Sequence, residues 1–324
     1  MPDADPNVVR ALRRRGLDLA RWLDACEAGW RSTNLDSIFR GNGGGAAAAA
    51  GKNDRSSRRY RACAREVLAR VRLETYVRPL RSADAEFEFL DLGCAPGGFA
   101  AELLRRFPRA RGYGVTLPPQ RGGQNLFREL RDHPRFRVWH ADAETEFPRE
   151  LARRTFDVVV DDAVATRTSA GSDPAPDCAD RLSKRTLALA LAHLSPGGVL
   201  VRRERLDAVV STMQRLSTLR RTFADWTAIK PASSYALTRT YFLTCSGYGT
   251  AVATMRTPET IASDVAALWR PLVDAHGEAI RRVIDGDGKF IAPTKASEKA
   301  RRTRSTKSEP RDDVEWRARR RRRS

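Results

Sequence analysis

The strongest constraint on the fold is an alternation of short apolar runs with amphipathic segments across residues 58–248. Between the runs, apolar side chains recur at helical spacing in residues 100–107, 182–194 and 206–223. Strands that alternate with helices form a largely parallel sheet covered on both faces. We therefore predict an α/β fold with a seven-stranded sheet. The predicted strands are residues 87–92, 112–115, 136–140, 156–161, 199–202, 226–230 and 240–245.

The last two predicted strands are joined too closely for a helical crossover. Their connection contains Pro231, Ser233 and Ser234 and is only a few residues long. Parallel neighbours need a connection of about a dozen residues or more, whereas antiparallel neighbours can be joined by a short turn. The sheet is therefore expected to be mostly parallel and to end in an antiparallel hairpin.

The segments that flank this region differ from it in composition. A glycine- and alanine-rich stretch is typical of a flexible linker. A second helical stretch is marked by Thr257 as a possible N-cap and by Pro258 at the first helical position. The last segment is basic and almost without aliphatic side chains, so disorder is expected there. The predicted order is a helical extension (1–40), a linker (41–57), a domain (58–250), a helical extension (257–294) and a basic tail (295–324).

The chain is strongly basic, with 59 lysines and arginines against 40 aspartates and glutamates, and its isoelectric point is near 10.7. Of the net charge of +19, residues 295–324 hold +8 (13 basic, 5 acidic), which leaves +11 (46 against 35) on residues 1–294. Such an excess favours a polyanionic partner, and RNA is the first candidate. The arginine run at residues 317–323 could clamp phosphates, serve as a nuclear import signal or remain a solvated tail.

Cysteine and histidine usage argues against a disulfide framework or a metal site. The five cysteines include no C-x-x-C pair, and the four histidines show no ligand spacing. No apolar run approaches the roughly 20 residues that span a bilayer, and the N-terminus lacks the apolar core of a secretory signal. We therefore expect no metal, no membrane and an intracellular setting, with the nucleus favoured over the cytoplasm by the basic tail. The sequence specifies no protein partner.

The most informative string is F-E-F-L-D-L-G-C-A-P-G-G-F-A at residues 87–100. An apolar strand is followed by a glycine-rich turn, and a helix begins near Gly98. Gly93, Gly97 and Gly98 have no Cβ, so the backbone can approach a ligand closely. The N–H groups at the helix start suit a carboxylate or a phosphate. Pro96 inside the turn distinguishes it from the dinucleotide-binding G-x-G-x-x-G spacing.

The string D-L-G-C-A-P-G-G-F resembles motif I of the FtsJ/RrmJ-like ribose 2′-O-methyltransferases, and the resemblance extends in order over residues 58–248. It implies a Rossmann-like methyltransferase fold with S-adenosylmethionine as cofactor. A purely structural strand-to-helix turn is the alternative. The resemblance implies cofactor contacts at this turn for Asp91, Gly93, Cys94, Ala95, Pro96, Gly97, Gly98 and Phe99.

Further segments resemble later parts of the same family. The string W-H-A-D ends at Asp142, which by this resemblance would reach the adenine amino group and alternatively caps a helix. Thr116 stands where many members have an acidic residue that holds the cofactor ribose. The string K-P-A-S-S-Y at residues 230–235 resembles the family's K-P-x-A-S-R near the substrate. That resemblance implies substrate contacts for Lys230, Ser233 and Ser234.

The family's catalytic tetrad of lysine, aspartate, lysine and glutamate is only partly kept. Its positions fall on Arg65, Asp162, Arg203 and Thr240, with Asp161 as the near alternative for the aspartate. A guanidinium keeps its proton in essentially any protein environment, so Arg203 can steer a hydroxyl or stabilise an alkoxide but cannot be a general base. Base duty would fall on Asp162 or Asp161, or on proximity alone. Adjacent carboxylates on a strand point to opposite faces, so one of the two is expected to be structural.

These features support three hypotheses of function. The leading one is an S-adenosylmethionine-dependent methyltransferase that acts on an RNA ribose 2′-hydroxyl, favoured by the motif strings and the basic charge. The second is a catalytically impaired relative that binds RNA or cofactor without methyl transfer, motivated by the substituted tetrad. The third is a methyltransferase with a non-RNA acceptor, since one fold supports many acceptors.

Overall fold

The structure is a computed structural model that describes residues 4–32, 35, 53–71, 73–76, 86–165, 177–249 and 257–285. The predicted basic tail and residues 41–52 of the predicted linker lie outside the described residues. The remaining linker positions, 53–57, are the first residues of helix α4 (Asn53–Leu68). Helical structure therefore begins inside the segment that was predicted to be a linker.

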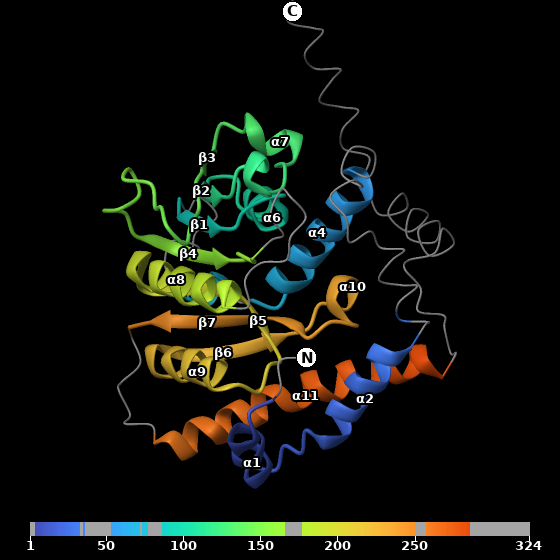
Figure 1. Ribbon diagram of the computed structural model, residues 1–324. Coiled ribbons are helices and arrows are strands. Elements are labelled where there is room, and N and C mark those ends of the chain that lie inside the picture. The colour runs from blue at the N-terminus through green and yellow to red at the C-terminus, as the bar shows by residue number, and fades with distance from the viewer. Residues whose placement is uncertain are drawn as a thin grey trace, which may run out of the picture.

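One seven-stranded sheet forms the centre of the described structure (Figure 1). Its spatial order is β3-β2-β1-β4-β5-β7-β6, with β1 to β5 parallel and β7 antiparallel to both β5 and β6. The predicted α/β, Rossmann-like methyltransferase sheet with an antiparallel end hairpin is confirmed. The strands are β1 (Glu88–Leu92), β2 (Arg111–Thr116), β3 (Phe136–His140), β4 (Phe156–Asp161), β5 (Leu194–Arg205), β6 (Phe223–Ile229) and β7 (Thr240–Tyr248).

Helices cover both faces of this sheet, and each face has its own hydrophobic cluster. Successive strand side chains point to opposite faces. Phe89 and Val160 therefore join one cluster, whereas Leu90 and Val159 join the other. The first cluster includes side chains of α4, α5 (Leu73–Tyr76), α6 (Gly98–Arg106) and α7 (Arg128–Arg131). The second includes α1 (Pro6–Arg14), α2 (Ala20–Arg31), α8 (Cys178–His193), α9 (Val210–Thr222) and α11 (Pro258–Ile284).

The long helix α11 runs beside α2 and packs against the sheet edge formed by β6 (Figure 1). Thr257 is its N-cap, because the side-chain hydroxyl accepts a hydrogen bond from the Thr260 backbone N–H. Its apolar stripe is buried at Val265, Trp269 and Leu272. The helix therefore attaches the N-terminal helices and the sheet to one another.

The carboxyl ends of β1, β4 and β5 lie side by side, because β4 pairs with both neighbours in parallel register. The backbone N–H of Asp162, just beyond β4, donates to the carbonyl of Leu92 at 2.9 Å. The chain leaving β4 thus contacts the start of the turn after β1. In parallel α/β sheets, ligands bind at this edge.

Candidate active site

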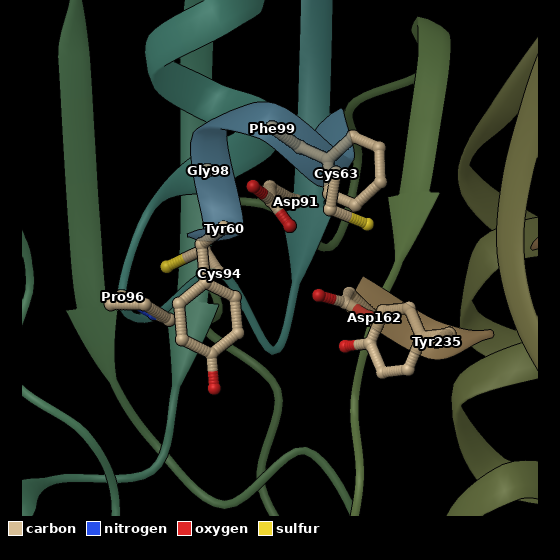
Figure 2. Close-up of a pocket in the computed structure, with 9 residues that line it drawn as sticks. All are labelled: Tyr60, Cys63, Asp91, Cys94, Pro96, Gly98, Phe99, Asp162 and Tyr235. Carbon is tan, nitrogen blue, oxygen red and sulfur yellow. The ribbon is translucent and has the colours of Figure 1, made fainter. Parts of the chain in front are cut away.

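A small pocket lies at the carboxyl ends of β1 and β4, between α4, α6 and the one-turn helix α10 (Ala232–Tyr235) (Figure 2). Polar side chains converge on it from α4, α10, the end of β1, the turn after β1 and the chain just beyond β4. Two carboxyl groups and two phenols are among them, which is a dense set of ionisable groups for one small pocket. The lining residues are Tyr60, Cys63, Asp91, Cys94, Pro96, Gly98, Phe99, Asp162 and Tyr235.

The glycine-rich turn is held tightly by the protein around it. A Cβ on Gly93 would lie 2.5 Å from the Ala163 Cα, and one on Gly98 would lie 2.6 Å from the Tyr60 carbonyl oxygen. Gly93 also has a φ of +76°, a conformation that L side chains rarely adopt. The glycines are therefore required by contacts of the turn with the end of β4 and with α4, a reason that the sequence pattern alone did not reveal.

Asp91 is a buried carboxyl group that faces the pocket and is 1% exposed. Burial raises its pKa well above the ordinary range, and the nearby Asp162 charge raises it further. The Ala100 backbone N–H is near enough to favour the charged form, but neither carboxyl oxygen has a partner with hydrogen-bond geometry in the described structure. A native protein rarely leaves both oxygens of a buried carboxyl unpaired, so this position is suited to a cationic ligand group.

Asp162 forms an ion pair with Arg203, whose Nε lies 2.5 Å from Oδ1 without the alignment of a hydrogen bond. Burial raises the pKa of Asp162 to about 6, although the Arg203 charge lowers it and the Asp161 charge adds to the rise. Burial lowers the pKa of Arg203, but the attraction of Asp162 together with Tyr235, Tyr60 and Cys63 outweighs burial and raises the pKa above its ordinary value. Arg203 therefore stays protonated, while Asp162 can exchange a proton near neutral pH.

Tyr235, at the end of α10, completes this cluster. Its hydroxyl accepts a hydrogen bond from Arg203 Nη2 at 2.7 Å, and the guanidinium carbon lies 5.2 Å from the centre of the phenol ring. The Phe242 ring lies beside Tyr235, and its centre is 5.8 Å from the same guanidinium carbon. Tyr235, Tyr60 and Cys63 were not among the site residues predicted from the sequence. The three-residue spacing of Tyr60 and Cys63 on one helix face was the signal for the latter two.

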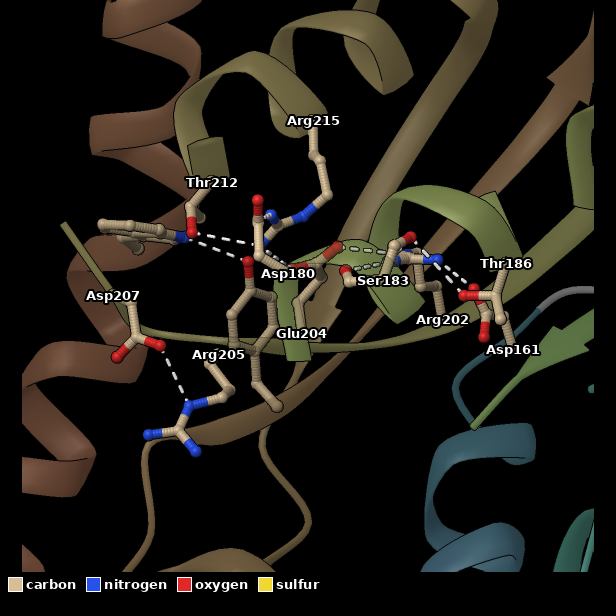
Figure 3. Close-up of polar contacts among 12 residues, drawn as sticks. Asp161, Asp180, Ser183, Thr186, Arg202, Glu204, Arg205, Asp207, Thr212 and Arg215 are labelled. Atoms are coloured by element: carbon tan, nitrogen blue, oxygen red, sulfur yellow. Dashed lines mark hydrogen bonds and ion pairs between the residues drawn. The ribbon is translucent and has the colours of Figure 1, made fainter. Parts of the chain in front are cut away.

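Asp161 does not line the pocket, and its side chain lies beside Arg202 instead (Figure 3). It is aligned with Arg202 in the parallel register and forms a buried ion pair with that arginine. Arg202 also donates to Glu204 Oε1 at 2.7 Å and to the Ser183 carbonyl at 2.9 Å. The structure therefore assigns Asp161 to a buried network and brings only Asp162 to the pocket, as the alternation of strand side chains requires.

Arg65 does not reach the pocket, contrary to its implied place in the tetrad. Its Nε lies 3.7 Å from Glu102 Oε2, and its side chain is 63% exposed. The α4 residues that do face the pocket are Tyr60 and Cys63. Since each residue of an α-helix is rotated by about 100° from the last, Arg65 lies about 200° around the helix from Cys63 and faces α6 instead.

Lys230 also points away from the pocket, although a substrate contact was implied for it. Its ammonium donates to the carbonyl of Thr240 at 3.0 Å and to that of Thr238. Burial lowers the pKa of Lys230 to about 7, and the nearby Cys26 thiol raises it slightly in return. Since Cys26 belongs to α2, the ammonium lies on the side of that helix. The lysine follows Ile229, whose side chain lies in the α4–α6 cluster, so the alternation of the strand places Lys230 on the far side.

The other implied substrate residues, Ser233 and Ser234, lie on α10 beside α4. The Glu66 carboxylate accepts hydrogen bonds from the Ala232 and Ser233 backbone N–H groups at 3.0 and 3.3 Å, and from the Ser233 hydroxyl. The Ser234 hydroxyl donates to the Arg59 carbonyl. These contacts fasten the helix that carries Tyr235 to α4.

Thr116 and Asp142, at the ends of β2 and β3, do not line the pocket itself. Thr116 is buried, and its carbonyl accepts from the Ala141 backbone N–H. Asp142 accepts from the Glu144 backbone N–H at 3.0 Å and pairs with Arg121 of η3 (Pro119–Arg121) at 3.1 Å. Its carboxylate therefore already caps a turn, close to the alternative considered from the sequence.

The polar groups of the pocket fit one type of ligand in particular. The unpaired Asp91 carboxyl suits an ammonium or sulfonium group. The first N–H groups of α6, which begins at Gly98, suit a carboxylate. A ligand with an amino acid group satisfies both. Among the described residues, no cluster of His, Cys, Asp and Glu is arranged to hold a metal ion, and no helix is long and apolar enough to cross a membrane.

Comparison with known proteins places residues 72–248 in the family described as FtsJ-like methyltransferase. No curated protein matches the chain. Similar solved structures include a ribosomal RNA methyltransferase from Plasmodium falciparum (13% identity, 57% of this chain and 96% of that chain, TM-score 0.39). A second is human methyltransferase-like protein 13 in complex with SAH (16% identity, 68% of this chain and 91% of that chain, TM-score 0.39). A third is an rRNA methylase from Streptococcus thermophilus (13% identity, 54% of this chain and 92% of that chain, TM-score 0.38).

Proposed function

Because the chain belongs to the FtsJ-like methyltransferase family, whose cofactor is S-adenosylmethionine, we propose that it methylates a ribose 2′-hydroxyl of RNA. The main support for this proposal is the environment of the Asp162 carboxyl group. Asp162 is a buried carboxyl group with a pKa of about 6, paired with a permanent cation, next to a turn suited to the cofactor. A ribose hydroxyl is a poor nucleophile at neutral pH, so a nearby proton acceptor of this kind has a clear use.

The residues proposed to hold the cofactor are those of the turn after β1. When bound, S-adenosylmethionine supplies a methyl group on a sulfonium centre. Asp91 would accept hydrogen bonds from its ammonium group, and the start of α6 at Gly98 would bind its carboxylate. Thr116 and Asp142, at the ends of the adjacent strands, are proposed to contact its nucleoside.

The acceptor half of the reaction is assigned to Asp162 and Arg203. Asp162 would accept the proton of the 2′-hydroxyl, and the Arg203 charge would stabilise the oxygen as it becomes negative. Since the pKa of Asp162 is raised, the carboxylate is available above a pH of about 6 and protonated below it. Methyl transfer is therefore expected to rise with pH through this value and then level off.

The charge of the chain supports RNA as the acceptor. Residues 1–294 carry a net charge of +11 apart from the basic tail, so an anionic polymer is attracted to the whole protein. The competing hypothesis of a catalytically impaired binder is favoured by two observations, the exposed position of Arg65 and the arginine at position 203. Neither removes the proton acceptor that the reaction needs.

The proposal is tested by incubating the purified chain with methyl-labelled S-adenosylmethionine and total RNA. We expect label to enter the RNA, and Asp162→Asn to reduce the rate by about 100-fold or more with cofactor affinity retained. Asp132→Asn, which removes an exposed carboxylate, is the matched control and should transfer normally. Full activity of Asp162→Asn would refute the catalytic assignment. Cofactor binding without transfer by the unmodified chain would favour the impaired binder.

A further inference from the structure

We propose that Tyr235 is a positioning residue: it limits the Arg203 guanidinium to a single contact with Asp162 and so leaves Asp162 Oδ2 open to the acceptor hydroxyl. The inference rests on the proposed function, in which this carboxylate takes the proton. It adds a residue whose role the motif strings did not indicate.

The contacts of Arg203 show how this restriction works. Nε and Nη2 lie along the same edge of a guanidinium, and this edge commonly binds both oxygens of one carboxylate. Here the edge is divided: Nε lies against Asp162 Oδ1, while Nη2 donates to the Tyr235 hydroxyl at 2.7 Å. The phenol therefore competes with Oδ2 for Nη2.

Tyr235 is itself held firmly in this position. The Glu66 carboxylate caps α10 through the Ala232 backbone N–H, and Arg59 Nη2 donates to the Ser234 carbonyl at 2.6 Å. The phenol ring packs on Phe242, with the ring centres 5.9 Å apart. A side chain fixed at both its backbone and its ring can dictate where the guanidinium lies.

The result is an Asp162 carboxylate with one oxygen engaged. In the described structure, the ion pair with Arg203 has its short contact at Oδ1, 2.5 Å from Nε, and no hydrogen bond among the described residues ends on Oδ2. Figure 2 shows the carboxylate beside the Tyr235 hydroxyl, within the pocket that also contains Asp91. A carboxylate chelated by an arginine would be held at lower pKa and would offer no free oxygen to a substrate.

Several ionisable groups surround Asp162, and a change at one of them must be separated from changes at the others. Asp161 adjoins it on the strand, and the remainder come from neighbouring elements. The neighbouring groups are Asp91 on β1, Arg203 on β5, Cys63 on α4 and Tyr235 on α10. The test therefore follows Asp162 directly.

The variant Tyr235→Phe keeps the ring and removes the hydroxyl. With Nη2 released, Arg203 is expected to chelate Asp162, which should lower the titration midpoint of that carboxyl by about one pH unit. Carboxyl ¹³C NMR of the chain without cofactor measures this shift. Methyl transfer should fall about tenfold or more at saturating cofactor, while cofactor affinity stays the same.

Two further variants complete the experiment. Tyr248 is the last residue of β7, and its phenol hydroxyl donates to the Leu191 carbonyl on α8. The variant Tyr248→Phe removes that hydroxyl and should change neither the titration midpoint of Asp162 nor the rate of methyl transfer. In an Arg203→Lys background, where a single ammonium cannot chelate, adding Tyr235→Phe should leave the Asp162 midpoint unchanged. An unchanged or raised midpoint in Tyr235→Phe alone would overturn the inference. If the unmodified chain transfers no methyl group, the proposed function fails, but the NMR titration still decides the role of Tyr235.

Discussion

Two aspartates that are neighbours in the sequence form ion pairs with two neighbouring arginines, and the two ion pairs lie on opposite faces of the sheet. Asp161 and Arg202 form an ion pair on one face, with both side chains 2% exposed. Asp162 and Arg203, one position later on each strand, form a second pair that faces the pocket. The first is a buried structural pair, and only the second lies where the proposed substrate would bind.

Asp91 provides a prediction at the same scale. At neutral pH a buried carboxyl without hydrogen-bond partners lowers the stability of the fold, because its pKa is raised relative to the unfolded chain. The fold is therefore not penalised at low pH, where Asp91 is protonated in both the folded and the unfolded chain. The free energy of unfolding falls as the pH rises from the ordinary pKa of an aspartate through the raised pKa of Asp91. Asp91→Asn should therefore increase the unfolding free energy of the cofactor-free chain at neutral pH by about 1–3 kcal/mol.

The same substitution should weaken S-adenosylmethionine binding, since the ammonium partner loses its counter-charge. Thermal unfolding and calorimetric titration measure the two effects separately. Asp157→Asn is the control, because its carboxylate accepts from the Glu88 backbone N–H away from the pocket. A less stable Asp91→Asn chain with unchanged cofactor affinity would show that Asp91 is structural.

At the scale of elements, the contact of α4 with α10 determines the shape of the pocket. Glu66→Ala removes the cap of α10 and should lower the unfolding free energy by about 1 kcal/mol. Methyl transfer should fall further than stability alone explains, because Tyr235 is carried on α10. Glu129→Ala, which breaks the half-exposed pair of α4 with α7 at Arg61, is the matched control. Equal transfer rates in the two variants would contradict this account.

The strands were predictable from the sequence because buried parallel strands have continuous apolar runs, and each run lies within an observed strand or within about one residue of its ends. The turn after β1 was predictable from its glycines. The positions of Arg65 and Lys230 were not. A matched string does not specify which way a helix faces, or on which side of a strand end a long side chain turns. Those directions depend on contacts with α6 and α2, which only the folded structure shows.

At the scale of the whole molecule, helices outside the matched region support the sheet. Trp269 of α11 is 1% exposed, and its indole N–H donates to the Tyr241 hydroxyl of β7 at 3.1 Å. Trp269→Ala should lower the unfolding free energy by about 3–5 kcal/mol, as measured by chemical denaturation. Trp30→Ala, at a 73% exposed position on α2, should have almost no effect. A small loss for Trp269→Ala would mean that α11 is not part of the stable core.

The most direct test of the central claim asks where on RNA the methyl group is attached. Alkali cleaves RNA through the 2′-hydroxyl, so a 2′-O-methylated ribose protects the bond that follows it. RNA labelled by the unmodified chain is digested with alkali and separated by size. We predict label in alkali-resistant dinucleotides, and no such label when Asp162→Asn is used. Label in mononucleotides would place the methyl group on a base and contradict it.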